Sequence, residues 1–420
     1  MAMKIVSILA IILSIFFGLV LSLNHTTDHD GYKGFLKTQG TNIVDENGKQ
    51  YLIKAMGLGN RAMDYITDSS RVNGIHHTEE SYKELSEMGF NSVRFLLNYN
   101  LFESDDEPYV YRQEGFDWID LNIEWAKKYG MRIILDMHCP QGGYQSWDRE
   151  KYRFDGLDEG DALWMNPEYQ KRLTALWAEI AKYYADEPTI IGYSFVNEPV
   201  VAIDGLSYTN FDDPGYQACF DLYQELIENT TEAVRKYDKN HIIFASRIFA
   251  FKDINKSWGK WIDANDDYNF IILDDPNVVY EFHFYKMHEY VAQAPDAETP
   301  IIYGEGKDLE FKDIVIYLDE YKAFSEKYNV PLFCGEYGVH NICFYEDGNG
   351  ENRGGAEWVS DVLSYFLEND IGSGYHSYYG GTLKRTDLGM YVTWDKIQVG
   401  SYQREERLYN ALVDTFNKYK

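Results

Sequence analysis

Two glutamates, Glu198 and Glu336, each end a short apolar run and are followed closely by proline or glycine. The runs are residues 190–199 and 330–338. A buried strand that finishes in a carboxylate places the charge at the rim of a sheet, where burial costs free energy unless the group is used. Two such rims facing one cleft indicate paired-carboxylate chemistry. The alternative is that each glutamate caps a helix or pairs with a lysine.

Further polar side chains stand in or at the ends of neighbouring predicted strands. They are Arg94 in the second strand, His138 after the third, Asn197 after the fourth, and His283 and Tyr285 in or after the sixth. The carboxyl ends of strands in a parallel barrel meet at one end, so we expect these side chains to surround one pocket. The set lacks a cysteine pair or His-rich metal spacing, which favours acid/base and nucleophilic chemistry without a metal or cofactor.

The two carboxylates need different protonation states for glycoside cleavage. A guanidinium from Arg94 near Glu336 would keep that carboxylate ionised, whereas Glu198, in a drier position, could hold its proton. Asn197 is placed to hydrogen-bond a sugar 2-hydroxyl. The alternative for Arg94 is a plain pair with Asp136, and the two histidines could be core residues.

Strand and helix patterns alternate along the chain. The strand candidates are residues 52–57, 92–97, 132–137, 190–196, 242–246, 278–284, 331–335 and 372–377. The helix candidates are residues 78–88, 116–129, 167–185, 216–237, 311–328, 356–369 and 403–419. This alternation predicts a (β/α)8 TIM barrel, preceded by a short β-hairpin over residues 35–51 with its turn at 45–48. A doubly wound open sheet is disfavoured because no Gly-rich phosphate loop follows any strand.

The composition of the chain limits the classes of binding partner that we expect. The 420 residues include 39 basic and 68 acidic ones, a formal charge of −29, which argues against nucleic acid or an anionic membrane. Aromatic residues make up 16% of the chain, which suits stacking on sugar rings as well as packing. Aromatic residues in the long segment 140–165 could line one end of a cleft or only cover the barrel rim.

Residues 1–23 have the pattern of a signal peptide or an uncleaved membrane anchor, residues 24–34 that of a linker, and residues 35–420 that of a single catalytic domain. We therefore expect a secreted monomer with no other membrane partner. The four cysteines, Cys139, Cys219, Cys334 and Cys343, allow three disulfide pairings, but Cys139 and Cys334 lie at predicted strand ends and could be buried thiols.

Several motifs in order carry a family resemblance. Asn197-Glu198-Pro199 and Gly335-Glu336-Tyr337-Gly338, with the segments around Arg94, His138 and His283, resemble glycoside hydrolase family 5, the family of cellulases and related β-glycanases. The resemblance covers nearly all of the chain after the linker. It implies double displacement with retention, Glu198 as acid/base and Glu336 as nucleophile, with the two carboxyls roughly 5–5.5 Å apart.

The eighth strand departs from the family pattern, in which a tryptophan forms the floor beneath the cleaved sugar. Residues 374–380 hold no tryptophan, and Tyr378 is the expected substitute, with Tyr379 or Trp394 as alternatives. For His376 we expect at most a supporting role behind the substrate contacts.

The resulting hypothesis is a secreted endo-β-1,4-glucanase that hydrolyses cellulose or β-glucan, with a β-linked polysaccharide or oligosaccharide as partner. A β-mannanase or an exo-β-glucosidase of the same family is the alternative within this chemistry. A non-catalytic carbohydrate-binding barrel is the alternative from a different class.

Overall fold

The computed structural model describes residues 31–59, 77–142, 163–164, 166–201, 214–251, 270–380, 388–392 and 403–420. The expected signal segment, most of the linker and most of the long aromatic segment lie outside these residues.

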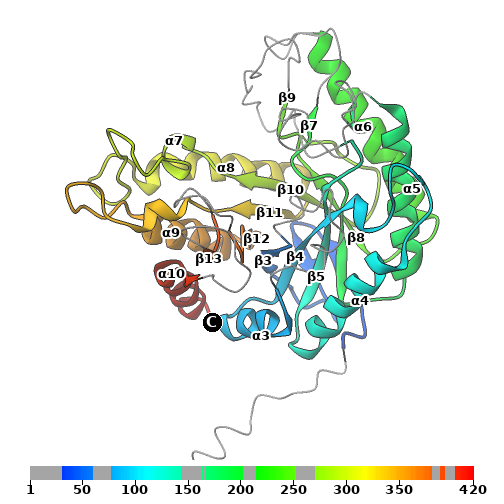
Figure 1. Cartoon of the computed structure of the whole chain (residues 1–420), viewed down its shortest axis with the longest axis horizontal. Helices are drawn as coiled ribbons and strands as arrows, with labels where there is room; N and C mark the ends of the chain where they lie inside the picture. Colours follow the sequence, from blue (N-terminus) through cyan, green and yellow to red (C-terminus); the bar gives the residue numbers. More distant parts are fainter. Residues whose placement is uncertain are drawn as a thin grey trace, which may run out of the picture.

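Eight parallel strands close into a barrel (Figure 1), in the order β10-β11-β12-β3-β4-β5-β6-β8. They are β3 (Lys54–Leu58), β4 (Ser92–Asn98), β5 (Arg132–Cys139), β6 (Ile190–Ser194), β8 (Ile242–Ser246), β10 (Val278–Phe284), β11 (Leu332–Tyr337) and β12 (Gly372–Tyr375). Each overlaps one of the eight predicted apolar runs, so the (β/α)8 barrel is confirmed. Side chains fill the interior and helices cover the outside, which is why nearly every strand residue is buried.

Helices surround the strands in Figure 1. They are α3 (Glu79–Met88), α4 (Gln113–Lys128), α5 (Pro167–Tyr184), α6 (Pro214–Arg235), α7 (His288–Val291), α8 (Phe311–Tyr328), α9 (Gly355–Glu368) and α10 (Glu406–Lys418), with 3-10 turns η2 (Tyr99–Leu101) and η4 (Asn341–Phe344). Local signals set their ends. The side chain of Asn166 accepts a hydrogen bond from the Glu168 N–H at the start of α5, and Gly89, with φ of 107°, ends α3.

The predicted N-terminal hairpin is present, but its turn lies elsewhere. Its strands are β1 (Lys37–Gln39) and β2 (Asn42–Val44). They pair antiparallel across a turn at Gly40, which has φ of +60°. The expected turn also forms, closed by a 3.0 Å hydrogen bond from Gly48 N to Asp45 O, but beyond it only one bridge pairs Val44 with Gln50.

This hairpin closes the amino end of the barrel. Leu36 and Ile43 pack in one apolar cluster with inward-facing strand residues such as Ile134 and Phe333. The Thr38 hydroxyl donates to the carbonyl oxygen of Pro276, just before β10, at 3.0 Å. The hairpin therefore supports the barrel at the end opposite the carboxyl ends of its strands, where the candidate site residues gather.

Short strands add to the loops that follow the barrel strands. β7 (Val200–Val201) pairs parallel with β9 (Ala250–Phe251), and β13 (Tyr391–Val392) pairs antiparallel with β14 (Gln403–Arg404). In the part of the chain that the structure describes, no helix is long and apolar enough to cross a membrane. All four cysteines are buried thiols, the alternative that the sequence offered for Cys139 and Cys334.

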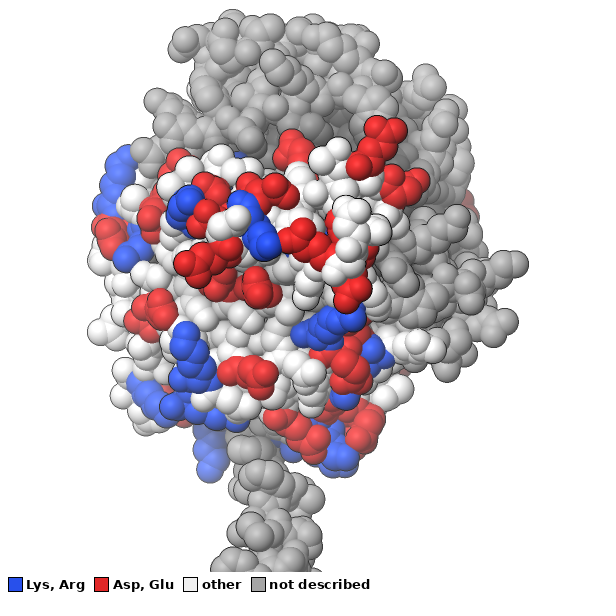
Figure 2. Space-filling view, turned by 90° about the vertical axis from the view of Figure 1, so that its left-hand side faces the viewer, with Lys and Arg blue, Asp and Glu red and all other residues white. Residues whose placement is uncertain are grey.

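The surface reflects the acidic composition. In Figure 2, acidic side chains are spread over the face shown, with lysine and arginine side chains between them. Opposite charges pair on the surface of the protein, as in the contact of Lys307 with Glu351. Exposed pairs of this kind contribute little to stability, so the fold depends mainly on its barrel and helix core.

Candidate active site

Arg94 lies at the centre of the polar cluster inside the barrel mouth and is fully buried. Its Nη1 donates to Glu336 at 2.8 Å, and its Nε donates to Glu281 at 3.0 Å. Its Nη2 donates to Asp136 at 2.9 Å and to the Asn197 side-chain oxygen at 2.8 Å. Arg94 therefore makes both contacts considered from the sequence: the structural pair with Asp136, and the contact with Glu336 that keeps this carboxylate ionised.

A buried guanidinium is stable here only because carboxylates surround it. Burial by itself would lower the pKa of Arg94, but the charges of Asp136 and Glu281 raise it. Arg94 thus stays charged and fixes the groups bonded to it. One of these is the Asn197 amide, whose oxygen faces the guanidinium.

Glu281 is a member of this cluster that the sequence argument did not single out. Its carboxylate is 1% exposed and accepts hydrogen bonds from the hydroxyls of Ser194 at 2.6 Å and Ser246 at 3.2 Å. Gly335, directly before Glu336, leaves room for it, because a Cβ at that position would lie 2.0 Å from Glu281 Oε1. The only feature of the sequence that could have pointed to Glu281 is its position as a single carboxylate within the predicted apolar strand 278–284.

Glu336 is held by donors on both oxygens. Oε1 accepts from Arg94, and Oε2 accepts from the Tyr285 hydroxyl at 3.0 Å. Burial by itself would raise the pKa of Glu336, but the neighbouring histidines and the guanidinium lower it well below its usual range. The carboxylate is therefore ionised at neutral pH, as expected from the sequence.

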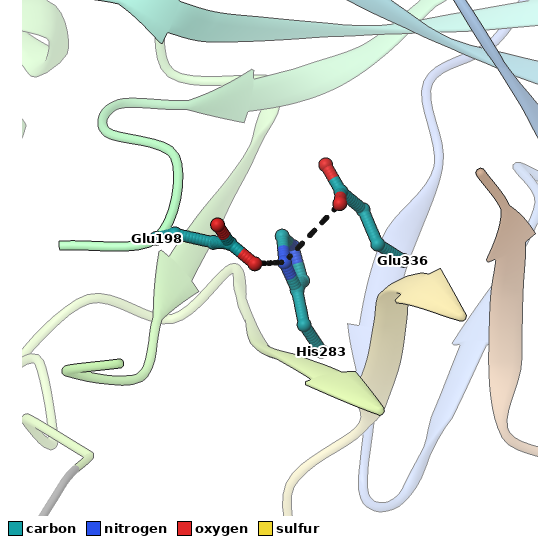
Figure 3. Close-up of side chains that lie close together, drawn as sticks. All are labelled: Glu198, His283 and Glu336. Carbon is teal, nitrogen blue, oxygen red and sulfur yellow. Dashed lines mark hydrogen bonds and ion pairs between the residues drawn. The ribbon is translucent and has the colours of Figure 1, made fainter. Parts of the chain in front are cut away.

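Glu198 faces Glu336 across His283 (Figure 3). His283 Nδ1 lies 2.9 Å from Glu198 Oε1 and 3.6 Å from Glu336 Oε2. Burial would lower the pKa of His283, but the surrounding carboxylates, foremost Glu336, raise it to about 10. The imidazolium therefore bridges the two glutamates.

The backbone and burial of Glu198 add two details. Its φ of 39° is a conformation that non-glycine residues rarely adopt, and such strain is frequent at functional sites. Glu198 is 9% exposed and Glu336 4%, so the expectation that Glu198 occupies the drier position is wrong. Glu336 differs from Glu198 in accepting a hydrogen bond from Arg94.

His138 completes the cluster. Its Nδ1 lies 3.0 Å from Asp136 Oδ2 and 4.0 Å from Glu336 Oε1. Asp136 also accepts from Arg94, so it fixes the imidazole and the guanidinium relative to each other. The structure thus brings the two glutamates together with Arg94, His138, Asn197, His283 and Tyr285.

Tyr378 is not with them. Its hydroxyl donates to Glu84 of α3 at 2.6 Å, and its ring packs against Tyr379 and Tyr391. The side chain is thus directed to the helix layer, and its expected placement as a sugar platform is wrong. His376, two residues earlier, lies beside Glu336 instead, with Nδ1 3.6 Å from Oε1.

Of the two alternatives to Tyr378, Tyr379 packs its ring against those of Tyr378 and Tyr391, and Trp394 lies outside the described residues. Most aromatic residues of segment 140–165 also lie outside them. Trp164 of that segment is buried with its ring 5.9 Å from that of Tyr223, the arrangement of a residue that covers the rim.

Glu198, His283 and Glu336 also have the residue types of a metal site, with one ligand atom of each within 4.8 Å of the others. A metal needs a neutral imidazole, and the raised pKa of His283 keeps its ring protonated at neutral pH. The arrangement therefore suits proton transfer and charge stabilisation better than metal binding.

A (β/α)8 barrel with two facing glutamates at its carboxyl end, one fixed by arginine and tyrosine, is the architecture of a glycoside hydrolase. The family described as cellulase (glycosyl hydrolase family 5) matches residues 44–381. The chain belongs to this family, so the resemblance seen in its motifs is confirmed.

Similar proteins agree with this assignment. Endoglucanase C of Acetivibrio thermocellus is 26% identical over 348 residues, which cover 75% of this chain and 86% of the relative. Cellodextrinase A of Ruminococcus flavefaciens is 26% identical over 326 residues, covering 76% and 83%. The crystal structure of endoglucanase Cel5A from Thermotoga maritima shares the fold with a TM-score of 0.59 and 20% identity, covering 86% of this chain and 96% of that one.

Proposed function

We propose that this protein is a secreted, retaining endo-β-1,4-glucanase that cleaves internal bonds of cellulose or mixed-linkage β-glucan. In this proposal Glu336 is the nucleophile and Glu198 the acid/base. The amino-terminal signal pattern at residues 1–23 supports secretion. The names of the relatives, an endoglucanase and a cellodextrinase, support a β-1,4-glucan substrate.

The observation that carries the proposal is the distance between the two glutamates. An oxygen of Glu198 and one of Glu336 lie within 4.8 Å of each other. An inverting enzyme needs carboxyls roughly 6.5–9.5 Å apart to admit a water molecule, whereas a retaining enzyme needs roughly 5–5.5 Å. The short distance supports direct attack by a carboxylate.

In the first step, Glu336 attacks the anomeric carbon while Glu198 gives its proton to the leaving glycosidic oxygen, whose bond to carbon breaks. In the second step, Glu198 takes a proton from water, the oxygen of that water bonds to the anomeric carbon, and the bond to Glu336 breaks. His283 Nδ1 lies 2.9 Å from Glu198 Oε1 and orients this carboxyl group for the proton transfer.

The surrounding donors act on the same steps. Arg94 and Tyr285 hold Glu336 ionised and oriented before attack, and stabilise its charge again when the covalent bond breaks. The side-chain oxygen of Asn197 accepts a hydrogen bond from Arg94. The amide N–H groups of Asn197 are therefore the groups that would donate to a sugar 2-hydroxyl.

The first test is reducing-sugar release from carboxymethyl cellulose, barley β-glucan, glucomannan, mannan and xylan, with Glu336→Gln as control. Activity on the glucans that the control lacks supports the proposal, and a preference for mannan would make the protein a mannanase. A folded protein inactive on every polymer and on aryl glycosides would leave only the binding role.

Two further measurements test the finer parts. Proton NMR of the first product shows its anomeric form, and retention requires the β-anomer before mutarotation. A fast fall in the viscosity of carboxymethyl cellulose per bond cleaved indicates endo attack, whereas sugar release at constant viscosity would indicate an exo enzyme.

A further inference from the structure

His376 places one ring nitrogen against the carboxylate of Glu336. Its Nδ1 lies 3.6 Å from Glu336 Oε1, slightly too far for a hydrogen bond. This nitrogen is inaccessible to solvent and has no hydrogen-bond partner among the described residues. The side chain as a whole is 17% exposed, so part of the ring reaches the solvent.

The ring of His376 lies between His138 and the backbone of β3. It stacks on the ring of His138 with centroids 6.3 Å apart and an angle of 6° between the planes. On another side, a Cβ added to Gly57 would lie 3.4 Å from Nδ1, an ordinary contact distance. The nitrogen therefore sits close to the backbone of β3 and beside Glu336.

Burial and the charged groups around the ring determine the protonation state of His376. Glu336 and Glu198 favour a positive ring, whereas Arg94 and His138 oppose it, and burial, the largest effect, lowers the pKa of His376. The ring is therefore neutral at neutral pH and has one N–H. A lone pair on Nδ1 would face a carboxylate oxygen, which is unfavourable, so the N–H belongs on Nδ1.

An unpaired buried donor next to a carboxylate has a free-energy cost that a small movement removes. A shift of a few tenths of an ångström by the Glu336 side chain would bring its Oε1 within hydrogen-bond distance. Attack on a sugar requires movement of this carboxylate, and the donor is already in place.

We propose that His376 is a positioning residue for Glu336, whose Nδ1–H donates to Oε1 as the carboxylate attacks the sugar and again as it leaves. This inference rests on the proposed function, because it takes Glu336 as the nucleophile. The consequence is that the end of the eighth strand supplies a hydrogen-bond donor to the nucleophile.

Three substitutions separate the possible roles. His376→Asn keeps an N–H donor near the position of Nδ1, His376→Gln places its amide near the other nitrogen, and His376→Phe keeps only the ring. We expect kcat/KM on β-glucan oligosaccharides to fall about tenfold to a hundredfold in the Gln and Phe variants, and much less in the Asn variant. Thermal unfolding shows that each variant is folded.

A second readout isolates Glu336 itself. The pH dependence of covalent labelling by an activated 2-deoxy-2-fluoro-β-cellobioside reports the ionisation of the nucleophile. Loss of the donor raises the pKa of Glu336, so the acid limb of labelling should move to higher pH in the Gln and Phe variants and stay in place in the Asn variant.

The outcomes distinguish failure of the inference about His376 from failure of the proposed glucanase function. If wild type is active but all three variants lose activity equally, or Gln retains more than Asn, the inference about His376 is overturned and the proposed function stands. If Phe retains most activity, the ring alone matters and the inference is likewise overturned. A wild-type protein that is neither labelled nor active on β-glucans would overturn the proposed function and this inference together.

Discussion

Glu281 accepts a hydrogen bond from Nε of Arg94 at 3.0 Å, so the guanidinium that orients Glu336 also binds a carboxylate that is 1% exposed. The same Glu281 oxygen lies 3.7 Å from His283 Nε2. One buried carboxylate is thus coupled to the groups next to both candidate catalytic glutamates.

Glu281→Gln should weaken both connections. Arg94 loses one of its charged partners, so we expect a fall of about 1–3 kcal/mol in the free energy of unfolding and roughly tenfold to a hundredfold in kcat/KM. The pKa of His283 should fall from about 10, because one of the carboxylates that raise it is neutralised. Urea unfolding, kinetics and histidine NMR measure the three effects.

Glu84→Gln is the matched control, because Glu84 is bonded to Tyr378 in the helix layer, outside the site. It should lower stability and leave the pKa of His283 unchanged. An unchanged His283 titration in Glu281→Gln would contradict the coupling.

Gly335→Ala should be severely damaging. Its Cβ would lie 2.0 Å from Glu281 Oε1 and 2.9 Å from His283 Nε2, and both atoms are fixed by neighbours. We expect activity below about one hundredth of wild type and a loss of roughly 1–3 kcal/mol in stability. Gly348→Ala, whose Cβ meets nothing within 4 Å, is the control and should behave like wild type. Equal activity of the two variants would show that the close packing below Glu336 is dispensable.

Two tyrosine substitutions distinguish Tyr285, which lies in the site, from Tyr378, which contacts the helix layer. Tyr285→Phe removes the donor to Glu336 Oε2 and should lower kcat about tenfold to a hundredfold. Tyr378→Phe removes a hydroxyl that donates to Glu84 in the helix layer, away from the site, so stability should fall by about 1 kcal/mol while kcat/KM stays within about twofold. A large kinetic effect of Tyr378→Phe with little loss of stability would restore it as a substrate residue.

Stability should depend on pH in opposite directions for two site residues. The pKa of Glu336 is lowered by folding from an ordinary value of 4.5, so its contribution is present above about pH 4.5 and is lost as the pH falls. The pKa of His283 is raised from 6.5 to about 10, so its contribution is present below about pH 6.5 and is lost as the pH rises towards 10.

Urea unfolding from pH 3 to pH 10 measures both contributions. The stability difference between wild type and Glu336→Gln should narrow on acidification, and that between wild type and His283→Gln should narrow on alkalinisation. The reverse pattern in either pair would show that the charge state assigned here is wrong.

A chelator should leave activity unchanged. The imidazole that would have to join Glu198 and Glu336 in holding a metal is protonated at neutral pH, because the carboxylates around it raise its pKa to about 10. Dialysis against EDTA followed by the glucan assay is the measurement. Activity that is lost and then restored by one divalent cation would show a metal enzyme instead.

The sequence by itself determined the barrel and most of its site. Apolar runs alternating with amphipathic helices define strand number and direction, and in a parallel barrel the residue that ends a strand must lie at the carboxyl end. That reasoning located Glu198 and Glu336 with Arg94, His138 and His283, because each lies in a strand or directly after it.

Only the tertiary structure decided which residues beyond these strands reach the site. β12 ends at Tyr375, and from there the direction of a side chain depends on how the chain packs, so His376 faces Glu336 while Tyr378 contacts α3. Glu281 was missed for a related reason. Its role comes from Arg94, Ser194 and Ser246 on other strands, and contacts between residues so far apart in sequence are set by the closure of the barrel.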